Sequence, residues 1–171
     1  IHHPIEVANI LAGLHLDSRS IIAAILHDTI EDTETAKAQI ASEFGEDVAE
    51  LVDGVSKISQ IEFQDKEEEQ AENFRKMVLA MTRDIRVIII KLADRLHNMR
   101  TIGALSLHRR RAIARETLDI YAPIANRLGV RQWASDLEDL AFSVLNPMRY
   151  RVLASAMSKR HGNRTAIVER I

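Results

Sequence analysis

Residues that interrupt helices are scarce in this chain, whose 171 positions hold 6 glycines and 3 prolines. No stretch alternates apolar and polar residues as a half-buried strand does. Apolar residues instead recur at helical spacing, as Val7, Leu11 and Leu14 do after Pro4, which suits the first turn of a helix. The sequence therefore predicts an all-α fold, a bundle of about 8–10 helices without significant sheet.

Helix boundaries follow from capping residues and helix breakers. Asp17 or Ser18 is expected to cap a helix over about residues 21–30, and Gly45 is expected to end the next one. The inward face of the helix after Asp17 should hold Ile22, Ile25 and Leu26. Further helices are predicted over residues 47–58, 74–81, 84–100, 109–128, 133–145 and 147–160, with a polar connection at 62–72 and a turn at 161–164.

Composition excludes several classes of protein. The chain has no cysteine, which rules out a disulfide scaffold, a zinc–thiolate site and a thiol nucleophile. No apolar run approaches the roughly 20 residues that span a bilayer, and no signal peptide is visible, so a cytoplasmic protein without a membrane partner is expected. Because residue 1 is isoleucine, we expect the domain to be incomplete at its N-terminus.

Charge is divided unevenly along the chain. Residues 1–72 hold 17 acidic and 4 basic side chains, a balance of −13, whereas residues 73–171 hold 8 and 19, a balance of +11. Either these are two solvated faces of opposite sign, or they form one site that holds a cation and an anionic ligand together. Direct nucleic-acid binding is disfavoured, since aromatic residues make up 4 % of the chain and no stacking platform is evident.

Four side chains have the chemistry of metal ligands. His27 and Asp28 follow an apolar run near a helix end, and His3 stands at the start of the first helix. Asp94 interrupts an otherwise apolar helix, where an isolated carboxylate is costly. Mixed imidazole and carboxylate ligands suit Mn²⁺, Fe²⁺ or Zn²⁺. The alternatives are a satisfied buried histidine at position 27 and a structural ion pair between Asp94 and Arg95.

A further carboxylate pair lies one helical turn after the first. Glu31 is four residues after His27, and Asp32 is four residues after Asp28, so each pair shares a helix face. Carboxylates beside a metal can orient an attacking water, take its proton and return a proton to the leaving group. We therefore expect Glu31 and Asp32 to be catalytic.

Polar residues that suit a nucleotide follow Asp94. Asn98 and Thr101 lie four and seven residues after it, on one helix face, and an amide and a hydroxyl can bind a nucleobase or a ribose. The arginines at positions 109–111 and Arg115 suit phosphates, because a guanidinium binds them in a bidentate manner. The alternative is a basic solvated face.

Several motifs are distributed over nearly the whole chain: His3-Pro4, LHDTIED at 26–32, GVSK at 54–57, QAENFRKM at 70–77, DRLHNMRT at 94–101, IARET at 113–117, YAP at 121–123 and RLG at 127–129. In these motifs the chain resembles the HD-superfamily hydrolase domain of RelA/SpoT homologues, the bacterial enzymes that degrade the alarmone (p)ppGpp.

The resemblance implies an all-α HD-domain bundle that binds one Mn²⁺ through His3, His27, Asp28 and Asp94. It implies that Glu31 and Asp32 assist the attacking water, that Asn98 and Thr101 lie along the nucleotide and that Arg111 lies near its phosphates. The implied reaction removes pyrophosphate from the 3′ position of (p)ppGpp and leaves GDP or GTP. A degenerate form of the domain lacks the His-Asp and Glu-Asp pairs, and both pairs are intact here.

The resemblance also implies further domains. Relatives continue into a (p)ppGpp synthetase domain and then regulatory domains, so residues 1–171 would be one HD-type hydrolase domain whose residues 147–171 begin the connection to the synthetase. Relatives also carry a tyrosine three residues before the His-Pro pair, and basic guanine-binding residues before it, at positions outside this chain. His2 stays an alternative to His3 as a ligand, although Pro4 favours His3.

Two other functions stay open at this point. The chain could be a non-catalytic nucleotide-binding module that regulates a neighbouring (p)ppGpp synthetase domain. It could also be an HD-type phosphohydrolase that acts on dNTPs or cyclic nucleotides, although the segments at 70–77 and 98–101 argue against that.

Overall fold

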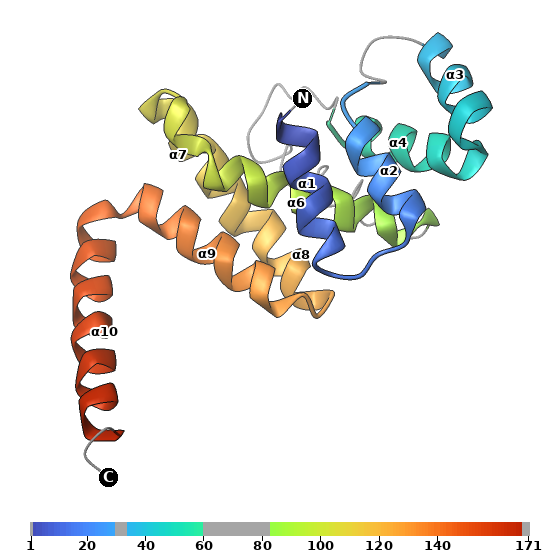
Figure 1. Cartoon of the computed structure of the whole chain (residues 1–171). Coiled ribbons are helices and arrows are strands. Elements are labelled where there is room, and N and C mark those ends of the chain that lie inside the picture. The colour runs from blue at the N-terminus through green and yellow to red at the C-terminus, as the bar shows by residue number, and fades with distance from the viewer. Residues whose placement is uncertain (1, 30–33, 60–82, 169–171) are drawn as a thin grey trace. The chain divides into compact units, whose positions relative to one another are not determined.

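The computed structural model describes residues 2–29, 34–59 and 83–168, and every regular element in these ranges is helical (Figure 1). This confirms the predicted all-α class. The connection at 62–72, the helix at 74–81 and the pair Glu31 and Asp32 lie outside the described residues. The chain divides into two compact units, Ile1–Thr101 and Ile102–Ile171.

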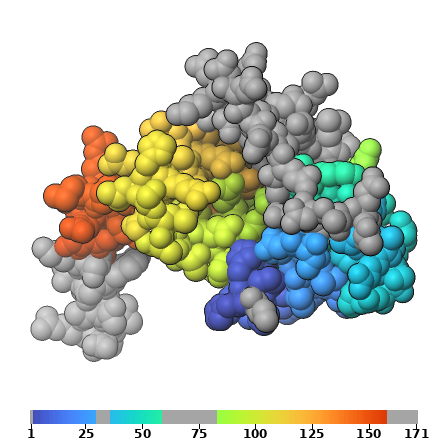
Figure 2. All heavy atoms as spheres, turned by 90° about the horizontal axis from the view of Figure 1, so that it is seen from above, coloured from blue at the N-terminus to red at the C-terminus, as the bar shows by residue number. Residues whose placement is uncertain are grey.

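The first unit is organised around one central helix. Its described helices are α1 (His2–Ala12), α2 (Ser18–Leu26), α3 (Glu34–Phe44), α4 (Glu46–Ser59) and α6 (Ile85–Arg100). The central helix α6 contacts α1, α2 and α4, while α2 also packs against α1 and α4. The adjacent positions of α1 and α2 are visible in Figure 2. Asp94 is the one charged residue among the buried residues of α6, so a carboxylate is placed inside this unit.

The buried face of α2 differs from the predicted one. Ile25, which we expected to face inward, is 44 % exposed, and the buried side chains of α2 are Ser20, Ala23 and Ala24. Small side chains let this helix approach α1 and α4 closely, whereas larger ones would hold it away. The same face continues one turn further to His27, which is buried just after the helix ends. Because His27 lies on the same face as Ala23 and Ala24, its side chain is buried inside the unit.

Capping residues set the starts of the two helices that carry these polar groups. Asp17 caps α2 by accepting a hydrogen bond from the N–H of Ser20 at 2.8 Å, as predicted. Asp84 caps α6 by accepting one from the N–H of Arg86 at 2.9 Å. The guanidinium of Arg86 bonds both caps, at 2.9 Å from Asp17 and 2.6 Å from Asp84. One arginine thus ties the starts of α2 and α6 together.

The second unit contains η1 (Ile102–Ala104), α7 (Leu107–Glu116), η2 (Thr117–Tyr121), α8 (Ala122–Arg127), α9 (Arg131–Leu145) and α10 (Pro147–Val168). The single helix predicted over 109–128 is interrupted by η2, a π-helical turn. α9 packs against α7, η2 and α8, and α10 contacts α9. The turn predicted at 161–164 is wrong, because α10 continues through it. The glycine in that segment, Gly162, costs a helix only about 1 kcal/mol, so it does not have to end the helix.

Gly45 ends α3 as predicted, with a φ of +92° that glycine adopts without strain.

Among the helices in the described ranges, none is both long enough and apolar enough to cross a membrane.

Candidate metal centre

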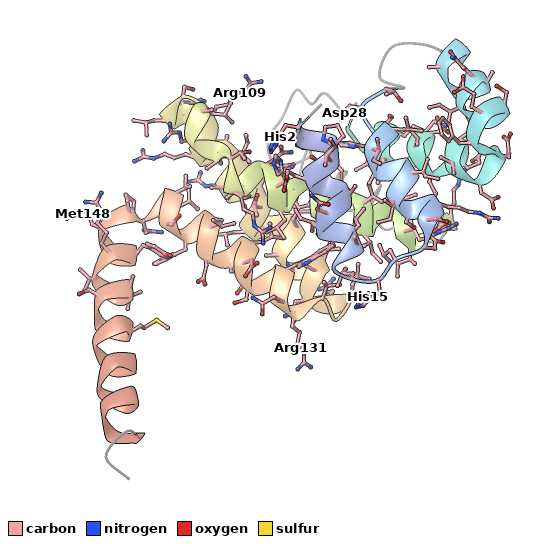
Figure 3. The ribbon with its side chains drawn as sticks, viewed as in Figure 1. His2, His15, Asp28, Arg109, Arg131 and Met148 are labelled. Carbon is pink, nitrogen blue, oxygen red and sulfur yellow. The ribbon has the colours of Figure 1, made fainter. Side chains whose placement is uncertain are left out.

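The first unit brings two histidines and two aspartates together from separate helices. His3 lies in the first turn of α1, and Asp94 lies in the middle of α6. His27 and Asp28 directly follow α2. Figure 3 shows Asp28 at that end of α2, close to the N-terminal end of α1, where His2 is labelled. All four side chains are those that the sequence predicts as metal ligands.

Short distances connect the four side chains. Nε2 of His3 lies 3.2 Å from Oδ1 of Asp94 and 3.8 Å from Oδ2 of Asp28. Nε2 of His27 lies 2.9 Å from Oδ1 of Asp28 and 4.0 Å from Oδ1 of Asp94. One donor atom from each of His3, His27 and Asp28 lies within 4.8 Å of the others. The adjacent His2 is exposed, so the geometry favours His3 as the histidine of this cluster.

The cluster is closed on one side and open on the other. The side chains of His27 and Asp94 are 3 % and 7 % exposed. Those of His3 and Asp28 are 30 % and 51 % exposed, so water and a substrate can reach the cluster from that side. This combination of a buried and a solvent-accessible half is the arrangement that a catalytic metal site needs.

The backbone holds the ring of His27 in one orientation. Its Nδ1 lies 2.6 Å from the carbonyl oxygen of Ala24, and because a carbonyl only accepts, Nδ1 must be the donor. The carbonyl of His27 in turn accepts a hydrogen bond from the buried hydroxyl of Ser56 at 3.3 Å. In the neutral ring, Nε2 therefore carries a lone pair directed toward the two aspartates.

Nε2 of His27 is the atom that best indicates a metal ion. It is buried and makes no hydrogen bond to any described residue, although Oδ1 of Asp28 lies 2.9 Å away. Buried polar atoms are normally paired, so an unpaired nitrogen beside two carboxylates needs an explanation. A divalent cation supplies one, since imidazole nitrogens and carboxylate oxygens are its usual protein ligands. The residues present fit such an ion.

The electrostatics of the cluster also suit a cation. Burial raises the pKa of Asp94, but the neighbouring imidazole of His3, the ammonium of Lys91 and the imidazole of His27 together outweigh it and hold this pKa well below the ordinary value. The neighbouring imidazole of His27 lowers the pKa of Asp28. Burial lowers the pKa of His27, but the Asp28 carboxylate, the Ala24 carbonyl and the Asp94 carboxylate together outweigh burial and raise it. Both carboxylates are therefore ionised at neutral pH, and two negative charges are available to a cation.

Neighbours on α6 hold the carboxylate of Asp94 in place. Nζ of Lys91 lies 2.9 Å from its Oδ2, and the amide of Asn98 donates to its Oδ1 at 2.7 Å. Asn98, which the sequence predicts as a nucleotide contact, is thus bonded to a candidate metal ligand. Its side chain is nevertheless exposed.

The other predicted site residues lie at the end of α6, in the second unit or outside the described residues. Thr101 ends α6, and its exposed hydroxyl lies 3.0 Å from the carbonyl of His97. Arg111 is exposed on α7, in the second unit. Its neighbour Arg110 donates to the backbone carbonyls of Leu105, at 2.6 Å, and Gly103. The structure does not describe Glu31 and Asp32.

Sequence reasoning did not identify His97 as part of this centre. Its Nδ1 lies 2.8 Å from Nδ1 of His3, and the two ring centroids are 4.7 Å apart. Burial, followed by repulsion from His3, lowers the pKa of His97, so its ring is neutral at neutral pH. The available signal was its spacing of three residues from Asp94, which places both on one side of α6.

Comparisons with known proteins indicate the family to which the chain belongs. The chain is 54 % identical over 171 residues to a guanosine-3′,5′-bis(diphosphate) 3′-pyrophosphohydrolase of Haemophilus influenzae, covering all of this chain and 25 % of that protein. It is 53 % identical over 171 residues to the bifunctional (p)ppGpp synthase/hydrolase SpoT of Escherichia coli K12, covering 24 % of it. A GTP pyrophosphokinase of Myxococcus xanthus is 50 % identical over 170 residues, which is 98 % of this chain and 22 % of that protein.

These relatives confirm the resemblance to RelA/SpoT homologues, and the chain spans about a quarter of their length. A crystal structure of lmo0812 from Listeria monocytogenes EGD-e shares the fold, with a TM-score of 0.63, 21 % identity, and coverage of 84 % of this chain and 96 % of that one. The model of the HD domain family matches residues 1–131. The chain therefore belongs to the HD domain family.

Proposed function

We propose that this chain hydrolyses (p)ppGpp to GDP or GTP and pyrophosphate, with Mn²⁺ as its cofactor. The single observation that supports the proposal most is the unpaired, buried Nε2 of His27, beside Asp28 and Asp94. HD domains imply a divalent metal, and the chain offers the ligands for one. The substrate follows from relatives that are 53–56 % identical over the whole chain and are named for this hydrolysis.

The metal would be held by His3, His27, Asp28 and Asp94. A divalent cation there supplies Lewis-acid polarisation and counter-charge for phosphate oxygens. Mn²⁺ suits this set because both imidazole and carboxylate ligands are among those it accepts. The half-exposed Asp28 marks the side from which a nucleotide would enter.

The other predicted site residues are assigned roles from their chemistry. Glu31 and Asp32 orient the attacking water and take its proton. The water oxygen bonds to the phosphorus next to the ribose 3′ oxygen while the bond between that phosphorus and the 3′ oxygen breaks. The carboxylates return a proton to the 3′ oxygen, and pyrophosphate and GDP or GTP are released. Asn98 and Thr101 lie along the nucleotide, and Arg111 contacts its phosphates.

We propose that the whole protein contains further domains besides this one. Residues 1–171 would form an HD-type hydrolase domain, with residues 147–171 leading toward a synthetase domain and regulatory domains beyond it. The whole protein would act in the cytoplasm, on a nucleotide and not on nucleic acid. The lengths of the relatives support a multidomain arrangement.

A second candidate function is regulation of a neighbouring (p)ppGpp synthetase domain without catalysis. The specific observation in its favour is that one relative, 50 % identical to this chain, is named a GTP pyrophosphokinase. Under this alternative the cluster would bind metal and nucleotide but release no product.

The decisive experiment measures pyrophosphate release from ppGpp by the intact protein with Mn²⁺, with Mg²⁺ and with a chelator. Asp28→Ala should abolish release, since it removes a ligand, whereas Asp139→Ala, an exposed aspartate of α9, should leave it unchanged. Release supported equally by Mn²⁺ and Mg²⁺ would refute the metal assignment. No release by a protein that binds Mn²⁺, together with altered (p)ppGpp synthesis in Asp28→Ala, would establish the regulatory alternative.

A further inference from the structure

His3 uses both of its ring nitrogens, and they face different groups. Nε2 faces the two carboxylates, at 3.2 Å from Asp94 and 3.8 Å from Asp28. Nδ1 faces away from them and lies 2.8 Å from Nδ1 of His97. The second contact joins α1 to α6 across 94 positions of sequence. A ring held at both nitrogens has little freedom to rotate.

His97 is itself well placed to hold His3. It lies on α6, three residues after Asp94, and its backbone carbonyl accepts a hydrogen bond from Thr101. The rings of His97 and His3 are inclined at 58° with centroids 4.7 Å apart, so they meet through their nitrogens and not by stacking. The helix that supplies the ligand Asp94 thus also supplies a partner for the ligand His3.

A neutral imidazole carries one proton, and a nitrogen that binds a metal must be free of it. If Nε2 of His3 is a ligand, its proton must be on Nδ1. Nδ1 of His3 then donates to Nδ1 of His97, which must accept, so the proton of His97 is on its Nε2. The direction of the hydrogen bond between these histidines therefore decides whether His3 can bind metal.

We propose that His97 is a positioning residue of the metal centre: it accepts the Nδ1–H of His3 and so fixes the tautomer and the ring orientation that direct Nε2 to the metal. This inference rests on the metal site of the proposed function. His27 shows the same device, because the carbonyl of Ala24 accepts its Nδ1–H at 2.6 Å. The backbone carbonyl of Ala24 thus accepts the hydrogen bond of His27, and the ring of His97 accepts that of His3.

Two substitutions of His97 separate positioning from general packing. His97→Asn places an amide oxygen, an acceptor, near the position of Nδ1, whereas His97→Leu fills similar space without an acceptor. His108→Leu is the matched control, because His108 is an exposed histidine of α7 in the second unit. Mn²⁺ affinity of the intact protein is measured by titration followed by electron paramagnetic resonance. This readout does not depend on hydrolysis.

We expect His97→Leu to weaken Mn²⁺ binding by about 10- to 100-fold, the usual effect of losing a partner of a ligand histidine. His97→Asn should retain most of the affinity, and His108→Leu should retain all of it. Equal Mn²⁺ affinity in His97→Leu and the unsubstituted protein would overturn the inference alone. Absence of Mn²⁺ binding by the unsubstituted protein would overturn the metal centre, and the inference with it.

A second measurement tests the inference even if the His97→Leu protein fails to fold. Nitrogen-15 spectra of the unsubstituted protein, loaded with diamagnetic Zn²⁺, report which ring nitrogen of each histidine carries a proton. A proton on Nδ1 of His3 and on Nε2 of His97 is the expected result. A proton on Nδ1 of His97 would reverse the hydrogen bond and overturn the inference.

Discussion

Replacing Lys91 with methionine should destabilise the metal-free protein by several kilocalories per mole. The Lys91 ammonium lies 2.9 Å from Oδ2 of Asp94, and the two side chains are only 13 % and 7 % exposed. Methionine keeps much of the apolar stem of lysine and removes the charge. The substitution therefore leaves a buried carboxylate oxygen without its cationic partner.

The separation and the burial give the size of the effect. At 2.9 Å and an effective dielectric constant of about 20, Coulomb's law gives an attraction of about 6 kcal/mol. Part of this is offset, because the removed ammonium no longer has to be desolvated. Breaking one side of a buried pair costs about 3–5 kcal/mol. We expect about 3 kcal/mol, at the lower end, because Asn98 and His3 still contact the other oxygen of Asp94.

Urea unfolding of the chain in the presence of a chelator, followed by circular dichroism, measures the change. Lys57→Met is the matched control, since Nζ of Lys57 lies 2.7 Å from an oxygen of Asp53 but its side chain is 66 % exposed. An exposed pair contributes at most about 1 kcal/mol. The two lysines thus differ in burial, and the oxygen of Asp53 also keeps a second cationic partner, Lys37, at 3.1 Å.

Equal losses from Lys91→Met and Lys57→Met would refute the reasoning from burial. The charge pair itself is tested in an Asp94→Asn background, where Lys91→Met should cost less than about 1 kcal/mol, because the partner carboxylate is gone. A loss that stayed near 3 kcal/mol there would show that other contacts of Lys91, and not its ion pair with Asp94, set the effect.

Three other outcomes follow from the structure. Gly54→Ala should lower the unfolding free energy by about 1–3 kcal/mol, measured by urea unfolding, because an added Cβ would lie 2.9 Å from Cγ2 of the branched, buried Val87. Hydrogen bonds from the side chain and N–H of Ser20, with a smaller contribution from Arg86, lower the pKa of Asp17, and those from the side chain and N–H of Arg86 lower the pKa of Asp84, both below 3.8. Their stabilisation is therefore present above pH 3.8 and lost as the pH falls through the lowered values, so Arg86→Met should reduce the stability difference between pH 5 and pH 2. Mn²⁺ at 100 times its dissociation constant should stabilise the folded chain by about 2.7 kcal/mol, and no shift in the melting temperature would contradict the metal centre.

Helix starts and stops were predictable where one residue has a special local role. Asp17 caps α2 through its own side chain, and Gly45 ends α3 in a conformation that other residues avoid. These interactions join residues close in sequence, so no knowledge of the fold is needed to see them. The π-helical turn at Thr117–Tyr121 was not predicted, although Pro123 just after it, which lacks a backbone N–H and crowds the carbonyl four residues earlier, was a local signal.

The buried face of α2 was not predictable from hydrophobicity. Ile25 is more apolar than Ala23 and Ala24, yet it is exposed while both alanines are buried. The choice depends on how closely α1 and α4 approach α2, and that distance is a property of the assembled unit. His27 is buried as a consequence of this packing, and its chemistry depends on it.

The sequence by itself determined the helical class and the four residues with the chemistry of metal ligands, because periodicity and donor type are properties of residues and their near neighbours. Only the tertiary structure decided that His3 and not His2 joins the cluster, that Nε2 of His27 is left unpaired, and that His97 contacts His3. Each of these depends on the packing of α1 and α2 against α6, which brings residues up to 94 positions apart within hydrogen-bonding distance. Side-chain patterns along a single helix carry no information about the distance and angle at which another helix will meet it.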